Sequence, residues 1–204
     1  MAEQHTKKIS AVKYSNIADS NLQHVIMTAS EDGTVKLWDR RNGDCVRTLS
    51  QTKGPFFSLD HNKHTICAGA FETIYFWDLR KMKLLETYTD SHSDDVTCVR
   101  YCSHNPDLLL TCATDNLCCQ FDFKQKPSNK EEDTIEGTYS SNQPLIDCRF
   151  IGKDKFWVTT SVNTIEVCDY ETAEVLVTID KVSNFLNKYF LVSSQSGLLD
   201  RWDL

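Results

Sequence analysis

Residues 28–39 read TASEDGTVKLWD, and this stretch decides the expected fold. Its first residues predict the end of a β-strand, and Glu31-Asp32-Gly33 predicts a turn. Residues 34–39 then predict the partner strand of a hairpin. The closing dipeptide, Trp38-Asp39, is the feature that recurs along the chain.

Five stretches of the chain end in an aromatic or apolar residue followed by aspartate. The copies are residues 38–39, 77–78, 121–122, 168–169 and 202–203. Successive copies lie 39, 44, 47 and 34 residues apart. These spacings bracket the roughly 40–45 residue period of a repeat that folds as one four-stranded propeller blade. The sequence therefore predicts an all-β propeller of about five four-stranded blades.

A second column of residues fixes the register of the repeats. Five positions before each aromatic residue or its substitute lie Gly33, Glu72, Asn116, Asn163 and Gly197. Four of these five are Gly or Asn, which adopt positive φ most readily. We expect this column in the tight turn of a two-residue β-hairpin.

The repeats fill one expected domain, residues 1–204. Their approximate bounds are 5–50, 54–89, 91–140, 144–180 and 181–204. The first repeat has three recognisable strands, at 24–30, 34–39 and 44–49, and the fifth lacks a fourth strand. Closed propellers typically have four to eight blades, and the fifth repeat here is incomplete. We therefore expect an incomplete, truncated ring, with a fragment and a divergent five-blade ring as the alternatives.

Composition indicates a soluble globular protein, with 40% hydrophobic and 25% charged residues. No segment approaches the roughly 18 consecutive apolar residues of a membrane span, and the first residues include no apolar stretch of a secretory signal. The nine cysteines are odd in number and lie mostly in predicted strands, which favours reduced core thiols. We expect a cytoplasmic or nuclear protein, or one found in both compartments, with no membrane partner.

The sequence carries no recognisable catalytic motif. It lacks a Gly-rich phosphate loop, a G-x-S-x-G elbow and an H-E-x-x-H helix. The groups most like metal ligands are His61, His64 and Cys67, and Cys98 with Cys102. Neither group has the paired spacing of a structural zinc site. We expect no catalytic residues, no cofactor, no metal and no small-molecule substrate.

Charge argues against nucleic acid as a partner. The net charge is −7, and no run of basic residues alternates with aromatic residues. Both features are unlike a specific nucleic-acid interface, which concentrates Lys and Arg on one face. Other proteins are the expected partners.

The stretch 28–39 is similar to the most typical form of the WD-repeat family, and all five segments can be read as copies of it. The resemblance covers nearly the whole chain. It implies a propeller that serves as a non-catalytic protein-interaction scaffold. The alternative function is that of a propeller-fold enzyme, such as a hydrolase, or of a subunit in a catalytic complex.

The resemblance also implies a set of hydrogen bonds inside each blade. Typical repeats join a His before the first strand, a Ser or Thr on the second, the hairpin Asp and the Trp. The first repeat offers a full set: His5, Thr28, Asp32 and Trp38. Such a set is physically sensible, because a buried indole N–H needs an acceptor and a buried Asp needs several donors.

The other repeats match this pattern less well. Repeat three offers His92, Thr111 and Asp115, but Phe121 replaces Trp, so its chain of bonds is expected to end early. Repeats two, four and five carry apolar or small residues at the Asp position, namely Phe71, Val162 and Ser196. We expect those blades to rely on apolar packing.

Two consecutive repeats also share a W-D-x-R box. Its candidate partner-docking residues are Asp39, Arg41, Asp78 and Arg80. Within the family, such a doubled box resembles the surface by which substrate receptors dock on the adaptor of the cullin-4 ubiquitin ligase. An Arg after a strand end offers a planar, permanently charged fork to carboxylates or carbonyls of a partner. The alternative is that each Arg pairs with its preceding Asp or faces water.

Overall fold

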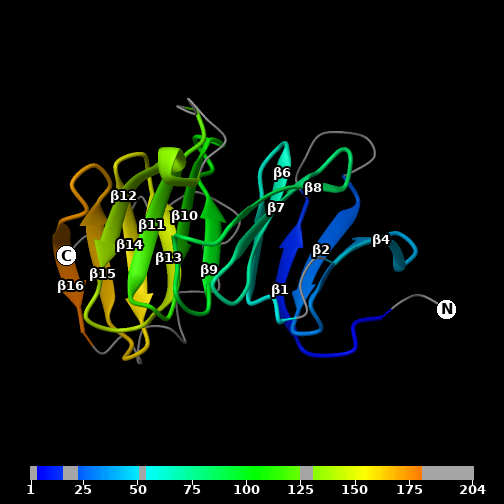
Figure 1. Cartoon of the computed structure of the whole chain (residues 1–204), viewed down its shortest axis with the longest axis horizontal. Coiled ribbons are helices and arrows are strands. Elements are labelled where there is room, and N and C mark those ends of the chain that lie inside the picture. Colours follow the sequence, from blue (N-terminus) through cyan, green and yellow to red (C-terminus); the bar gives the residue numbers. More distant parts are fainter. Residues whose placement is uncertain (1–3, 16–22, 51–53, 125–130, 181–204) are drawn as a thin grey trace.

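The computed structural model describes residues 4–15, 23–50, 54–124 and 131–180. These residues form four antiparallel sheets of four strands, which follow one another along the chain (Figure 1). Each sheet is one blade, and its strands lie in sequence order. The predicted all-β propeller fold is confirmed. The described part contains four blades where about five were predicted, and the fifth repeat, 181–204, lies outside the described residues.

The blades are built from strands of four to seven residues. Blade one contains β1 (Ile9–Tyr14), β2 (Val25–Ser30), β3 (Thr34–Asp39) and β4 (Asp44–Ser50). Blade two contains β5 (Ser58–His61), β6 (Thr65–Gly69), β7 (Ile74–Asp78) and β8 (Lys83–Tyr88). Blade three contains β9 (Cys98–Tyr101), β10 (Leu108–Cys112), β11 (Leu117–Asp122) and β12 (Ile135–Ser140). Blade four contains β13 (Leu145–Ile151), β14 (Lys155–Thr160), β15 (Ile165–Asp169) and β16 (Val175–Ile179).

Strand β1 was missed by the sequence analysis, which assigned three strands to the first repeat. This strand pairs with β2, and its register shifts between Ile9 and Ala11. The irregularity interrupts the alternation of side chains that marks a half-buried strand. Each residue of β1 is exposed or half-buried, whereas each of the other inner strands, β5, β9 and β13, buries at least two residues.

The turn between the second and third strands has the predicted backbone conformation in all four blades. Gly33, Glu72, Asn116 and Asn163 have φ of 80°, 52°, 73° and 62°. The predicted turn size was wrong, because three or four residues separate these strands instead of two. In blade one the Gly33 N–H donates to the Ser30 carbonyl at 3.2 Å. A turn followed by a left-handed residue is common in hairpin loops longer than two residues, which explains the column of positive φ.

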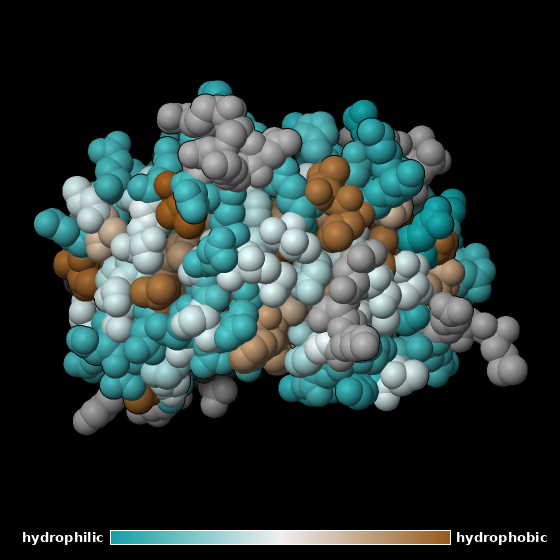
Figure 2. Space-filling view, in the orientation of Figure 1, coloured by the Kyte–Doolittle hydropathy of each residue, from teal (hydrophilic) through white to brown (hydrophobic). Residues whose placement is uncertain are grey.

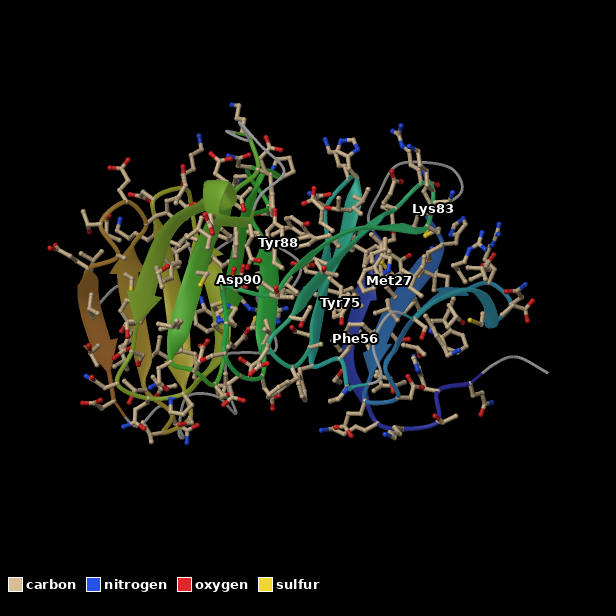
Figure 3. The ribbon with its side chains drawn as sticks, viewed as in Figure 1. Met27, Phe56, Tyr75, Lys83, Tyr88 and Asp90 are labelled. Carbon is tan, nitrogen blue, oxygen red and sulfur yellow. The ribbon has the colours of Figure 1, made fainter. Side chains whose placement is uncertain are left out.

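The apolar cores lie between neighbouring blades. One cluster joins blades one and two, a second joins blades two and three, and a third joins blades three and four. Successive residues of one strand face opposite sides, so Ile66 packs towards blade one and Cys67 towards blade three. Figure 3 labels Phe56 and Tyr75 at the first of these interfaces, where their ring centroids are 5.5 Å apart.

Hydroxyl groups link the inner strand of one blade to the start of the next. Each donates to a carbonyl oxygen across the interface: Ser10 to Phe56 at 2.6 Å, Ser58 to Val96 at 3.0 Å, and Thr97 to Leu145 at 2.8 Å. The three donors hold equivalent places in blades one to three, because each directly precedes a register-matched residue, namely Ala11, Leu59 or Cys98. In blade four that position holds Ile146, whose side chain is 44% exposed.

The face of the molecule in Figure 2 carries its apolar side chains in several small patches. The outermost strand of blade four, β16, is exposed along its length. It lies at the left edge of Figure 1. The helical content of the described residues is one 3₁₀ turn, η1 (Glu131–Thr134), and none of their helices could cross a membrane.

Glu72 offers a test of the turn column, because it has a positive φ without being Gly or Asn. A left-handed backbone conformation costs a residue with a Cβ about 1–2 kcal/mol, and substitution by Gly removes this cost. The higher entropy of Gly in the unfolded chain offsets part of the stability gained. We expect Glu72→Gly to raise the free energy of unfolding by up to about 1 kcal/mol in urea titrations. The matched control, Glu31→Gly, replaces a turn residue without positive φ and is expected to destabilise. Destabilisation by both substitutions would contradict the explanation.

Candidate functional site

A chain of hydrogen bonds crosses blade one from the third strand to the segment before β1. Trp38 Nε1 donates to Thr28 Oγ1 at 2.8 Å, and Thr28 Oγ1 lies 2.7 Å from His5 Nε2. His5 Nδ1 lies 2.8 Å from Asp32 Oδ2. The structure therefore brings together all four residues of the set. The segment before β1 is held to the β2–β3 turn by this chain of bonds.

The direction of these bonds follows from the groups themselves. A carboxylate can only accept, so the His5 proton lies on Nδ1 and faces Asp32. With a neutral imidazole, His5 Nε2 then accepts from the Thr28 hydroxyl, whose oxygen accepts from the indole. Burial acts to raise the pKa of Asp32, but hydrogen bonds from Thr34, from the Thr6 N–H and from His5 outweigh it and hold the pKa well below its usual value.

Blade three has the same arrangement without its last member. His92 lies 3.0 Å from Asp115 Oδ2 through Nδ1 and 2.8 Å from Thr111 Oγ1 through Nε2. Phe121 has no donor, so the chain ends at Thr111. Burial acts to raise the pKa of Asp115, but bonds from His92 and from two backbone N–H groups lower it overall.

Blades two and four replace this network by apolar side chains. Cys67 stands where blade one has Thr28, and Phe71 stands at the Asp position with its ring 53% exposed. Blade four has Val158, Val162 and Cys168 at the Thr, Asp and Trp positions. In blade two the buried Trp77 keeps its indole, and Nε1 has no hydrogen-bond partner among the described residues. Ser196, the corresponding residue of repeat five, lies outside the described residues.

The first W-D-x-R box lies at the end of β3. Asp39 accepts two hydrogen bonds from Arg41 Nε, at 2.9 and 3.2 Å, and a further one from Nη2. The bonds from the Arg41 side chain lower the pKa of Asp39 to about 2. Arg41 is exposed, so its charged fork meets solvent while it is paired with the preceding Asp.

The second box lies at the end of β7, the equivalent strand of blade two. Asp78 accepts from the backbone N–H groups of Arg80 and Lys81, at 2.8 and 2.7 Å. The side chain of Arg80 is exposed, and its guanidinium makes no hydrogen bond within the described part of the chain. Because β3 and β7 hold the same place in consecutive blades, the two boxes lie at the same end of neighbouring sheets.

The Asp of each repeat also has a local structural role. In all four blades its Oδ1 accepts from the backbone N–H two residues later, at 2.7–3.0 Å. Such a turn mimics a backbone turn and ends the third strand. Asp39 and Asp78 therefore shape the loop that carries each Arg, whether or not they touch a partner.

The sequence analysis missed one cluster of chemically reactive side chains. Cys98, Cys112 and Cys148 come together, and their sulfur atoms all lie within 4.8 Å of one another. Sequence spacing had grouped Cys98 with Cys102, because it could not show that two blades meet there. In the other group considered for metal binding and rejected from its spacing, His61 has both ring nitrogens 3.2 Å from carbonyl oxygens, of Asn62 and Tyr14. Cys67 of that group lies in a core cluster.

Comparison with known proteins agrees with the repeat pattern. The family model "WD domain, G-beta repeat" matches residues 2–39 and 82–122. A Dictyostelium discoideum WD repeat-containing protein 89 homolog is 27% identical over 88% of this chain and 46% of its own length. The Arabidopsis thaliana WD repeat-containing protein GTS1 is 25% identical over 87% of this chain and 46% of its length. The predicted WD-repeat resemblance is confirmed. Residues 65–80 and 92–122 also resemble WD repeat-containing protein 89 in sequence, in agreement with the first of these relatives.

The chain spans about half the length of these relatives. A more distant relative is histone acetyltransferase type B subunit 2 of Candida glabrata, 26% identical over 65% of this chain and 31% of its own length. Its name describes one subunit of a larger assembly.

The hydrogen-bonded sets predict that substituting Ala at the Asp position lowers the free energy of unfolding more in blades one and three than in blade four. We expect Asp32→Ala and Asp115→Ala each to lower the free energy of unfolding by about 1–3 kcal/mol, because buried donors lose their acceptor. The matched control is Val162→Ala, at the same position of blade four, where the side chain is 55% exposed and the loss is expected to be small. Equal losses at all three positions, measured by urea titration, would show that the bonds contribute nothing.

The same two carboxylates predict acid sensitivity. Their pKa values are lowered in the folded chain, so their contribution is fully present above the ordinary Asp pKa of about 3.9 and is lost as the pH falls below it. We expect the double variant Asp32→Asn/Asp115→Asn to be less stable than the unaltered chain near pH 7. The difference should shrink in urea titrations at about pH 3. A difference that stays constant across this range would contradict the assignment.

Proposed function

We propose that this chain, whose repeats match those of the WD40 family, is a non-catalytic protein-interaction scaffold. The observation that carries the proposal is the rim formed by the ends of β3 and β7, where two Arg side chains project from equivalent turns. The turns are fixed by Asp39 and Asp78, and in blade one the strands beneath them are joined by the bonds of His5. A rigid frame with exposed loops is the usual basis of a binding surface.

Within this proposal, the sharper hypothesis is that the rim docks on the adaptor of the cullin-4 ubiquitin ligase. Arg80 supports it, because its guanidinium is exposed and makes no hydrogen bond to the described residues. The pairing of Arg41 with Asp39 is compatible with docking, since an exposed ion pair contributes little to stability and can exchange for a partner carboxylate. The protein is proposed to act in the cytoplasm, the nucleus or both.

The second candidate function is that of a subunit in a catalytic complex. The relative named as a histone acetyltransferase subunit favours it. In that case the chain would still act by holding proteins together, and purified chain alone would show no hydrolase activity. Turnover of hydrolase substrates by the purified chain would instead support a propeller-fold enzyme.

A pull-down with the purified cullin-4 adaptor tests the docking hypothesis. We expect Arg80→Ala to weaken capture by about tenfold or more, as for an Arg at the centre of an interface. Arg80→Lys should weaken it too, because an ammonium cannot reproduce a planar fork. Arg41→Ala should act in the same direction, and none of the three should change the melting temperature appreciably.

The matched control is Arg47→Ala, which removes an exposed Arg from β4, outside both boxes. It should bind as the unaltered chain does. Failure of the unaltered chain to capture the adaptor, or equal capture by an Arg41→Ala/Arg80→Ala double variant, would reject the cullin-4 role. The scaffold proposal would then rest on partners identified by other means.

A further inference from the structure

Three thiol groups converge in the interface between blades three and four. Cys98 lies on β9, Cys112 on β10 and Cys148 on β13. Their sulfur atoms are all within 4.8 Å of one another, and each side chain is at most 1% exposed. Two further buried cysteines of the same core cluster, Cys118 and Cys168, are not members of this group.

The fold explains why these residues meet. Cys98 and Cys112 are direct partners in the ladder between β9 and β10, so their side chains lie on one face of the sheet. That face packs against blade four, where Cys148 follows the first residues of β13. The group is therefore drawn from both sides of one interface, with two sulfurs from blade three and one from blade four.

Charged groups border the thiols on one side. Cys98 Sγ lies 2.8 Å from Asp147 Oδ1, and Arg100 Nη2 lies 3.3 Å from the same oxygen. Arg149 Nε lies 3.7 Å from the other oxygen of Asp147. Two guanidinium groups thus stand beside one carboxylate, which leaves positive charge near the sulfur atoms.

We propose that Cys98, Cys112 and Cys148 form a three-thiolate binding site for monovalent copper. This site is independent of the proposed scaffold function. Thiolate sulfur is a soft ligand that favours Cu(I) and zinc over harder cations. Metal–sulfur bonds of about 2.3 Å would place three sulfurs of a trigonal site about 4 Å apart, which lies within the 4.8 Å that bounds the three sulfur atoms.

The number of ligands favours copper over zinc. Structural zinc is almost always held by four ligands, and the group contains three. Asp147 contacts Cys98, but the group of mutually close ligand atoms consists of the three cysteines alone. Binding would replace the three thiol protons, which pass to solvent, and the guanidinium groups would offset the thiolate charge. A site made from two blades also couples binding to the packing of their interface.

Copper content after refolding is the test. The full chain is refolded from urea without oxygen, with Cu(I) buffered by a strong Cu(I) chelator that prevents single exposed thiols from retaining copper. We expect one copper ion per chain and a higher melting temperature than after refolding with chelator alone. X-ray absorption at the copper edge should show three sulfur neighbours.

Cys148→Ala and Cys112→Ala should lose the bound copper. The matched control is Cys168→Ala, which removes another fully buried thiol from the same core cluster and should retain it. Circular dichroism checks that each variant has folded. The X-ray absorption measurement on the unaltered chain decides the case if the variants do not fold.

Copper that persists in Cys148→Ala, disappears equally in Cys168→Ala, or never binds the unaltered chain would overturn the proposal. So would a copper-edge spectrum without three sulfur neighbours. A parallel refolding with zinc separates the two ions. Zinc retained in preference to copper, with the same dependence on Cys112 and Cys148, would overturn the assignment to copper.

Discussion

A four-stranded blade has two faces and no interior, and the rest of this structure depends on that constraint. Every apolar cluster contains residues of two blades, so no blade can bury its side chains without a neighbour. Hydrogen bonds also join the inner strand of one blade to the next blade, because a hydroxyl of one blade donates to a carbonyl oxygen at the start of the next. The stability of such an array comes from the interfaces between repeats. A substitution therefore changes the stability of the interface into which its side chain packs.

The Thr, Asp and Trp positions of a blade are stabilised by hydrogen bonds in some blades and by apolar packing in others. Blade one ties its turn to the preceding segment through His5, Thr28 and Asp32, all with partners. Blade four places apolar residues at the Thr, Asp and Trp positions, so no buried polar group is left there to satisfy. Blade two is intermediate, because Trp77 keeps its indole without an acceptor among the described residues. A buried unpaired donor costs free energy, so blade two holds its Trp through packing with Phe56 and Tyr75.

The sequence was a good predictor of the features that recur in each repeat. The turn column identified the left-handed residues, including Glu72, whose type alone would not have suggested positive φ. The polar sets of blades one and three could be named from matching positions. Sequence failed where a feature departs from the repeat or joins two copies of it. Strand β1 has no buried residue, unlike the equivalent strands of the other blades. Cys112 and Cys148 belong to different blades, so no spacing rule connects them.

That failure shows where features particular to this chain lie. At one register position of the inner strands, the four blades carry Ala11, Leu59, Cys98 and Asp147. The frame needs only that these side chains fit between blades, so their chemistry is free to differ. Cys98 and Asp147 are neighbours in space because they hold the same place in successive blades, and their contact at 2.8 Å is a property of the pair of repeats. Chemistry in a propeller can therefore arise from residues that each repeat, taken alone, would present as ordinary core.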